Sequence, residues 1–121
     1  GLIRLGVITQ NLDEALDMKS GQLKDWYMHN TSHWIGLDVH DVGVYLPDGK
    51  PRLLESGMCL TVEPGLYFGA WRPDVVCPER YANIGIRIED DILVTDDGPV
   101  VLTDKCPKTI DEIEHIIGSA V

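Results

Sequence analysis

Alternating apolar and polar positions predict strands in the second half of the chain. Residues 84–95 (IGIRIEDDILVT) give the clearest signal, because Ile84, Ile86 and Ile88 recur at every second position. Residues 58–63 (MCLTVE) alternate in the same way and stop at a Pro-Gly turn. We expect the isoleucine side of the first segment to face an apolar core.

Segments next to these strands have the pattern of hairpins and bends. Asp97-Gly98 is a hairpin signal that leads from residues 84–95 into a further strand over residues 99–103. A bulge or bend is expected at Asp90-Asp91. Residues 33–45 contain apolar residues without a helical stripe and two interrupting glycines, so we expect extended structure with bulges or turns.

Two segments have helical spacing. Residues 12–18 (LDEALDM) consist largely of good helix formers, and Asn11 precedes them as a cap. Thr109 and Glu112 have the spacing of a capping box at the start of a final helix. The buried face of that helix is expected to consist of Ile110, Ile113, Ile116 and Ile117. Helices around a run of hairpin-connected strands indicate an α+β fold with a mainly antiparallel sheet.

The charge of the chain is strongly acidic. Among 121 residues, 20 acidic and 10 basic side chains give a net charge of −10. This length suffices for one small domain, and the charge argues against nucleic acid and anionic membranes as partners. The sequence has no apolar run of about 20 residues, and its first residues do not have the pattern expected of a signal peptide. The composition indicates a globular protein whose acidic groups are either solvated or able to collect cations.

Three cysteines, Cys59, Cys77 and Cys106, form an odd set without C-x-x-C spacing. This pattern argues against a disulfide framework or a zinc knuckle and favours a reducing, cytoplasmic compartment. The chain starts with Gly1 inside an apolar pattern. Such a start is expected of a chain cut from a longer protein, although a residual tag glycine would look the same.

Residues 29–41 (HNTSHWIGLDVHD) contain three of the four histidines of the chain. His29 and His33 are spaced like the pair in the helical zinc motif H-E-x-x-H, but Asn30 replaces its glutamate. The β-branched and aromatic neighbours also argue against a helix here. The three histidines are therefore candidates for metal binding, for acid–base catalysis or for simple packing.

Strand parity places several polar side chains on one side of the predicted sheet. Glu63 points away from the apolar residues of its strand, together with Thr61, while Arg87 and Glu89 share the face opposite the isoleucines. With His33, the two glutamates can reach a common polar cavity, and this ligand set suits manganese, cobalt or zinc. Such sites activate water for hydrolysis. A solvated Glu89, or an ordinary surface ion pair with Arg87, is the alternative.

Three segments in this order resemble the C-terminal part of the catalytic domain of Xaa-Pro aminopeptidases (aminopeptidase P). They are 29-HNTSHWIGLDVHDVG-43, 55-ESGMCLTVEPGLY-67 and 78-PERYANIGIRIEDDILVT-95. The resemblance implies the pita-bread fold shared with prolidases and methionine aminopeptidases, a curved, mainly antiparallel sheet with flanking helices. It also implies removal of the N-terminal residue from peptides with proline in second position, whose tertiary amide general aminopeptidases handle poorly.

The resemblance implies a centre of two divalent metal ions, usually manganese, with cobalt or zinc as alternatives and water as the nucleophile. His33 matches the histidine ligand of the family. Glu63 matches a ligand glutamate that also handles the proton of the attacking water, and Glu89 matches the glutamate that bridges both metals.

Four further residues match positions that act around the substrate. His29 and His40 match histidines that contact the substrate and steady the tetrahedral intermediate. Arg87 matches an arginine that orients neighbouring carboxylates, and Tyr67 is expected to line the substrate pocket. Asn30 stands where many relatives have a small residue, which could alter the loop near His29.

The two remaining ligands of the family are aspartates on strands upstream of the first histidine. Only Asp13, Asp17 and Asp25 precede His29 in this chain, and the first two lie on a predicted helix. The resemblance therefore implies that residues 1–121 are an incomplete catalytic domain, without its upstream half and N-terminal domain. Alone, such a chain is expected to be inactive, unable to hold two metals at peptidase affinity, and prone to form a homo-oligomer through exposed apolar surface.

Two alternative functions stay open. A prolidase, which cleaves Xaa-Pro dipeptides only, shares the fold, and the determinants of substrate length lie outside this chain. A non-catalytic pita-bread domain that binds peptides is the other alternative. In such domains the ligand positions are typically replaced, whereas His33, Glu63 and Glu89 are all present here.

Overall fold

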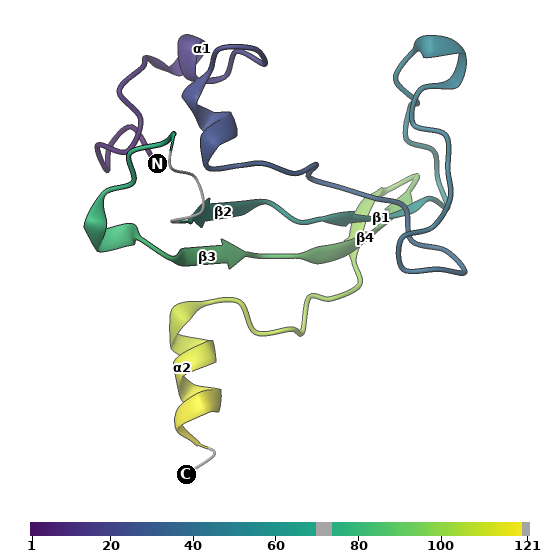
Figure 1. Ribbon diagram of the computed structural model, residues 1–121. Helices are drawn as coiled ribbons and strands as arrows, with labels where there is room; N and C mark the ends of the chain where they lie inside the picture. Colours follow the sequence, from purple (N-terminus) through teal and green to yellow (C-terminus); the bar gives the residue numbers. More distant parts are fainter. Residues whose placement is uncertain (70–73, 120–121) are drawn as a thin grey trace. The chain divides into compact units, whose positions relative to one another are not determined.

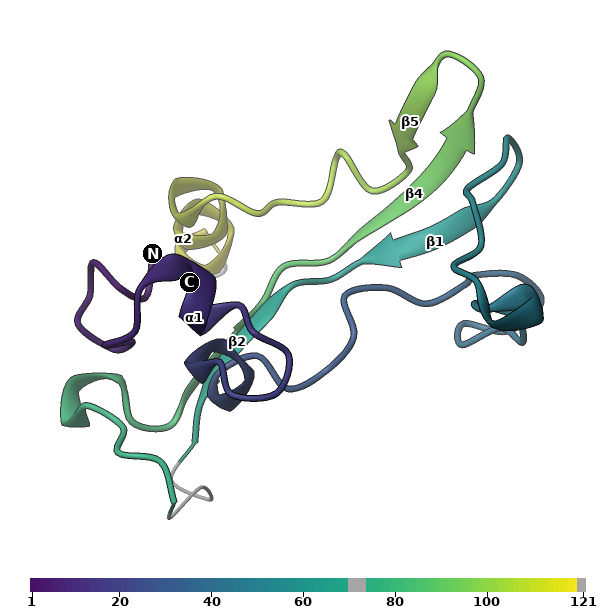
Figure 2. The same cartoon turned by 90° about the horizontal axis from the view of Figure 1, so that it is seen from above.

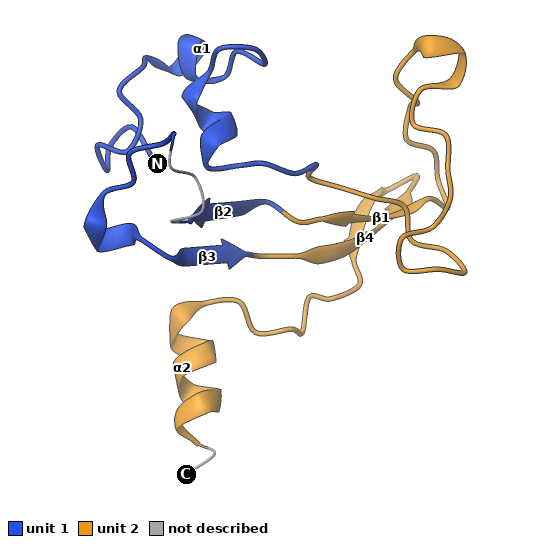
Figure 3. Ribbon diagram, in the orientation of Figure 1, with its two compact units in different colours: residues 1–30, 64–87 blue, residues 31–63, 88–121 orange. Residues whose placement is uncertain are grey.

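The computed structural model describes residues 1–69 and 74–119, which form two compact units (Figure 3). Each unit combines two separate stretches of the sequence. Unit 1 consists of residues 1–30 and 64–87, and unit 2 consists of residues 31–63 and 88–121. The predicted strands are divided between the two units, so each unit has a sheet of its own.

Unit 2 contains a three-stranded antiparallel sheet in the order β1–β4–β5. Its strands are β1 (Cys59–Val62), β4 (Asp90–Thr95) and β5 (Gly98–Val101). A two-residue turn joins β4 to β5, and Thr95 pairs with Gly98 across it (Figure 2). Gly98 has a φ of 118°, which glycine adopts without steric cost. The hairpin predicted at this position is therefore confirmed.

Unit 1 contains a two-stranded antiparallel sheet of β2 (Gly65–Phe68) and β3 (Ile84–Arg87), which lie side by side in Figure 1. The single strand predicted over residues 84–95 is thus two strands. The interruption lies at residues 88–89, not at Asp90-Asp91, where the pairing with β1 is regular.

The buried apolar side chains of the described residues all lie in unit 1. This core consists of Val7, Ile8, Ala15, Trp26 and Phe68. The ring centroids of Trp26 and Phe68 are 5.1 Å apart. The Trp26 carbonyl also accepts the backbone N–H of Tyr67 at 2.9 Å, which ties the N-terminal stretch to β2.

The expectation that the isoleucine side of residues 84–95 faces a core is wrong for this chain. Ile84, Ile86 and Ile88 are 41%, 61% and 48% exposed. Alternation separates the two faces of a strand but does not reveal which face is covered. Nothing in the described part of the chain covers these three side chains well enough to bury them.

The predicted helices form, with two differences. Helix α1 (Leu12–Ala15) has the expected Asn11 cap and a reciprocal bond between Asn11 and Glu14. It is shorter than predicted, because the Asp17 carboxylate accepts the N–H groups of Lys19 and Ser20 and so forms a turn.

Helix α2 (Ile110–Gly118) begins at the predicted capping box of Thr109 and Glu112. Its isoleucine side is exposed, so the expectation of a buried face is wrong. Short 3-10 turns are η1 (Gln22–Asp25), η2 (Pro47–Gly49) and η3 (Glu79–Tyr81). Within residues 1–69 and 74–119, no helix combines the length and the apolar character that crossing a bilayer requires.

Candidate metal centre and its surroundings

The polar side of β1 is its buried side. Thr61 is 1% exposed and Glu63, just beyond the strand, is 7% exposed, whereas Val62 between them is 40% exposed. Strand parity correctly grouped Thr61 with Glu63. Parity alone did not show that this polar side is the buried one, where Thr61 and Glu63 bind each other through a hydrogen bond.

Residues 31–35 run antiparallel to β1 and carry His33 to that polar side. The backbone hydrogen bonds run from Ile35 N–H to Cys59 O, from Thr61 N–H to His33 O and from Glu63 N–H to Thr31 O, at 3.0, 3.0 and 2.8 Å. Residues 36–40 then bend, in line with the interruption expected at the first glycine, and within residues 33–45 strand pairing is limited to a bridge between Trp34 and Leu60.

The His33 ring is oriented with one nitrogen toward a carboxylate. Its Nδ1 lies 3.0 Å from the carbonyl oxygen of Trp34, which can only accept, so we assign the proton to Nδ1. Its Nε2 lies 3.2 Å from Oε1 of Glu63. A nitrogen lone pair and a carboxylate oxygen repel each other unless a proton or a metal cation lies between them. Metal-binding histidines commonly donate their second N–H to a carbonyl in this way.

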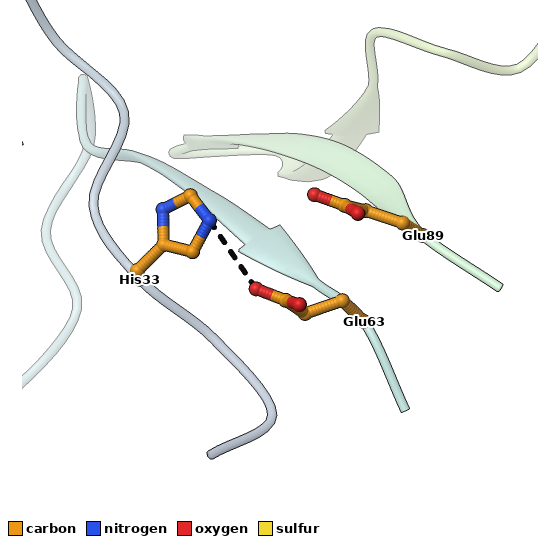
Figure 4. A group of neighbouring side chains, drawn as sticks. All are labelled: His33, Glu63 and Glu89. Carbon is orange, nitrogen blue, oxygen red and sulfur yellow. Dashed lines mark ion pairs between the residues drawn. The ribbon is translucent and has the colours of Figure 1, made fainter. Parts of the chain in front are cut away.

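Glu89 adds a second carboxylate. Val62 pairs with Asp90, so the next positions, Glu63 and Glu89, lie opposite each other at the end of this ladder. One ligand atom from each of His33, Glu63 and Glu89 lies within 4.8 Å of the others (Figure 4).

This arrangement fits a cation. Two bonds of about 2.1 Å to one ion span at most about 4.2 Å, so binding would draw the groups together only slightly. Like charges directly opposite on paired strands destabilise a sheet, and a divalent cation between Glu63 and Glu89 would remove that repulsion.

His40 lies against the same group. Its ring centroid is 4.4 Å from that of His33, with the rings nearly perpendicular. On a continuous strand, His33 and His40 would lie on opposite faces, because seven positions separate them. The bend that follows residue 35 brings them together, and the side chain of His40 remains exposed.

A second polar cluster, in unit 1, consists of His29, Tyr67 and Arg87. Arg87 donates its Nε–H to the Tyr67 hydroxyl at 2.7 Å, and that hydroxyl lies 2.9 Å from Nε2 of His29. His29 Nδ1 lies 2.7 Å from the Asn30 carbonyl oxygen, so Nδ1 carries the proton and Nε2 accepts the proton of Tyr67. The three side chains thus form a directed chain of hydrogen bonds.

Two glycines leave room for the Tyr67 ring. A Cβ atom at Gly65 would lie 2.5 Å from the Tyr67 hydroxyl oxygen, and one at Gly85 would lie 3.1 Å from Cδ1 of the same ring. The ring therefore lies over backbone on both strands of this sheet, where any larger residue at Gly65 would displace it.

The residues predicted from the sequence thus separate into two groups. His33, Glu63, Glu89 and His40 come together in unit 2, and His29, Tyr67 and Arg87 come together in unit 1. The sequence alone assigned no role to Thr61 or to the carbonyl groups that orient the histidine rings. The Thr-x-Glu spacing on one strand face was the available signal for Thr61.

Sequence comparison identifies relatives along nearly the whole chain. Residues 2–96 match the sequence model of the metallopeptidase family M24. The Xaa-Pro aminopeptidase of Escherichia coli K12 is 48% identical over 120 residues, which cover 99% of this chain and 26% of that protein. The Xaa-Pro aminopeptidase of Haemophilus influenzae is 44% identical, with 97% of this chain and 26% of that protein covered.

Solved structures agree with these matches. An aminopeptidase of Pseudomonas aeruginosa matches with a TM-score of 0.86 and 44% identity over 98% of this chain and 26% of that chain. A zinc-substituted aminopeptidase P of E. coli in complex with product matches with a TM-score of 0.85 and 48% identity, over 99% of this chain and 26% of that chain. These matches confirm the α+β, pita-bread type of fold. The chain spans about a quarter of the length of these relatives, and it belongs to the metallopeptidase family M24, a family of metal-dependent enzymes.

Proposed function

We propose that this chain provides part of the active site of an Xaa-Pro aminopeptidase, which removes the N-terminal residue from peptides with proline in second position. The observation that carries the proposal is the group of His33, Glu63 and Glu89 in a chain 48% identical to such an enzyme. Because the relatives are much longer, the activity belongs to a full-length enzyme. Residues 1–121 would be the incomplete C-terminal part of its catalytic domain.

The metal centre would use Nε2 of His33 and the carboxylates of Glu63 and Glu89. One imidazole with two carboxylates suits manganese, with cobalt or zinc as alternatives, and the family resemblance favours two ions. When bound, the ions supply Lewis acidity toward the scissile carbonyl and toward water. Glu63 would also accept the proton of the attacking water, since its carboxylate lies beside Nε2 of His33, the candidate ligand nitrogen.

The substrate would be handled by the remaining polar residues. His40 is exposed beside His33 and can offer a ring N–H to the reacting carbonyl. In unit 1, Arg87 holds the Tyr67 hydroxyl and, through it, the ring of His29. We assign His29 and Tyr67 to substrate binding and Arg87 to the support of both.

The isolated chain should lack this activity. It carries three residues of the expected five-ligand set, and too few negative groups to hold two divalent ions at peptidase affinity. Exposed apolar side chains such as Ile86 and Ile110 favour self-association of the chain. A cytoplasmic location is proposed from the cysteine pattern alone.

The decisive experiment is a peptide assay on the full-length enzyme. The enzyme is stripped with a chelator, given Mn²⁺, and offered an Xaa-Pro-Yaa tripeptide and an Xaa-Pro dipeptide. We expect Mn²⁺-dependent cleavage of the tripeptide, its loss in His33→Ala, and normal activity in His115→Ala, which alters an exposed histidine on α2.

Other outcomes identify the alternatives. Cleavage of the dipeptide alone would indicate a prolidase, and tripeptide binding without cleavage would indicate a non-catalytic module. Turnover by the 121-residue chain itself would overturn the expectation that the chain is inactive alone.

A further inference from the structure

Among the described residues, Thr61 has the largest side chain that is almost fully buried, and its hydroxyl group contacts two residues that carry candidate metal ligands. The hydroxyl oxygen accepts the backbone N–H of His33 at 3.0 Å. The same hydroxyl lies 3.0 Å from Oε1 of Glu63. A threonine hydroxyl has a single proton, and the His33 amide already donates to its oxygen. The hydroxyl proton is therefore directed at the Glu63 carboxylate.

These two bonds have a consequence for the candidate metal ligands. A buried hydroxyl is tolerated only when it is hydrogen-bonded, and here both of its bonds end on residues that carry candidate ligands. The position of the Glu63 carboxylate is thereby linked to the backbone of His33. The carboxylate oxygen that Thr61 contacts is the one that lies 3.2 Å from Nε2 of His33.

Thr61 is also fixed in place more firmly than a surface threonine. Its backbone N–H donates to the His33 carbonyl at 3.0 Å, so backbone and side chain bind the same neighbouring segment. Its side chain is β-branched and therefore stiff about χ1. Rotation about χ1 would remove both hydrogen bonds from a side chain that is only 1% exposed.

We propose that Thr61 is a positioning residue of the metal centre, whose hydroxyl holds His33 and Glu63 in ligand geometry before any cation binds. This proposal rests on the proposed metal-dependent function. It assigns Thr61 no contact with metal or substrate. It predicts that the loss of the hydroxyl weakens metal binding itself, because the two ligands must then be ordered by the cation.

The test is calorimetric titration of the chelator-treated full-length enzyme with Mn²⁺ alone. Thr61→Val keeps the shape and removes the hydroxyl, and we expect about 10- to 100-fold weaker Mn²⁺ binding, the usual effect of losing a group that orients a ligand. Thr61→Ser keeps the hydroxyl and should bind within about 3-fold of the unsubstituted enzyme.

Thr95→Val is the matched control. The Thr95 hydroxyl donates to the carbonyl of Gly98 within the β4–β5 hairpin, away from the ligands, so Mn²⁺ affinity should not change. The visible absorption spectrum of the Co²⁺-loaded enzyme provides a second readout. It should shift in Thr61→Val and stay unchanged in Thr61→Ser and Thr95→Val, because it reports ligand geometry.

Each outcome bears on the proposal. Unchanged Mn²⁺ affinity and an unchanged Co²⁺ spectrum in folded Thr61→Val would overturn it while leaving the metal-dependent function intact. If Thr61→Val does not fold, Thr61→Ser decides: retained affinity supports the proposal, and a loss above about 10-fold in folded protein overturns it. Absence of Mn²⁺ binding in the unsubstituted enzyme would overturn the proposed function and, with it, this role of Thr61.

Discussion

The two units bury different kinds of side chain. Unit 1 buries Trp26 and Phe68 together with smaller apolar residues. Among the residues of unit 2 that the structure describes, the buried ones are Thr61 and Glu63, both polar. Unit 1 is therefore stabilised mainly by the removal of apolar surface from water. Unit 2 depends on its strand ladder and on hydrogen bonds between side chains.

This difference indicates how the chain combines stability with chemistry. Apolar burial is the main favourable contribution to folding, whereas a buried carboxylate is unfavourable unless it is hydrogen-bonded or paired. In unit 2 this unfavourable burial of a carboxylate occurs at Glu63, where the candidate ligands lie close together. The polar cluster of unit 1, in contrast, lies outside its apolar core and is only partly buried.

The largest expected effect is on the unit 1 core. Trp26→Ala removes a ring that is 4% exposed and packs against Phe68, and should lower the free energy of unfolding by about 3–5 kcal/mol. Trp34→Ala is the matched change in unit 2. That indole is partly exposed, stacks on Tyr45, and has a buried N–H that finds no hydrogen-bond partner among the described residues, so its loss should cost clearly less. Urea denaturation of the 121-residue chain measures both, and equal losses would contradict the comparison.

The second prediction concerns Glu63→Gln in the full-length enzyme. Without metal, the free energy of unfolding should fall by no more than about 1 kcal/mol, because an amide oxygen can still accept the Thr61 hydroxyl while the repulsion with Glu89 is relieved. With Mn²⁺ at 100 times its dissociation constant, the unsubstituted enzyme should gain about 2.7 kcal/mol and the variant far less. Thermal unfolding with and without Mn²⁺ tests this, and an equal gain in both proteins would exclude Glu63 as a ligand.

The third prediction concerns the polar cluster of unit 1. Gly65→Ala should displace the Tyr67 ring and lower the free energy of unfolding by about 1–3 kcal/mol. Gly85→Ala requires the same ring to shift by only a few tenths of an ångström, so it should be milder. Urea midpoints and the NMR signals of the His29 ring distinguish the two variants. An unperturbed His29 signal in Gly65→Ala would show that Tyr67 does not orient that ring.

The smallest effect is the response to acid. The Thr103 hydroxyl and Lys108 lower the pKa of Asp90 in the folded chain. Its contribution to stability is therefore fully present above the unfolded pKa of about 3.9 and is lost as pH falls through the folded value. Asp90→Asn should flatten the decline of the urea midpoint below about pH 4.

Asp17→Asn provides the comparison in unit 1. Hydrogen bonds from Ser20 and Lys19 lower the pKa of Asp17, but they close only a local turn. The Asp90 contacts connect β4 to residues 103–108. A stronger acid response from Asp17→Asn than from Asp90→Asn would reverse the expected order.

Local signals in the sequence predicted the local structure well. Alternation located β1 and the stretch that contains β3 and β4, Asp97-Gly98 located the hairpin, and the Thr109 box located the start of α2. Each of these signals acts over a few residues, so it does not depend on the rest of the fold. The candidate metal centre was found because each of three separate strand-like stretches carries one candidate ligand: His33, Glu63 or Glu89.

The features that escaped prediction depend on contacts between distant segments. Periodicity distinguished the two faces of β1 but not which face is buried, because residues 31–35 determine that. The approach of His40 to His33 required the bend at residues 36–40, where Gly36 indicated an interruption but not its direction. The length of α1 depended on a carboxylate, Asp17, that competes for backbone N–H groups just beyond the helix.

The position of Glu63 opposite Glu89 also constrains how this gene can change. Their separation is determined by the register of β1 and β4, not by the length of chain that connects them. Insertions or deletions between β2 and β3 can therefore accumulate without moving the two carboxylates. A single-codon insertion or deletion inside β1 or β4 would send one of them to the opposite face, because side chains alternate along a strand.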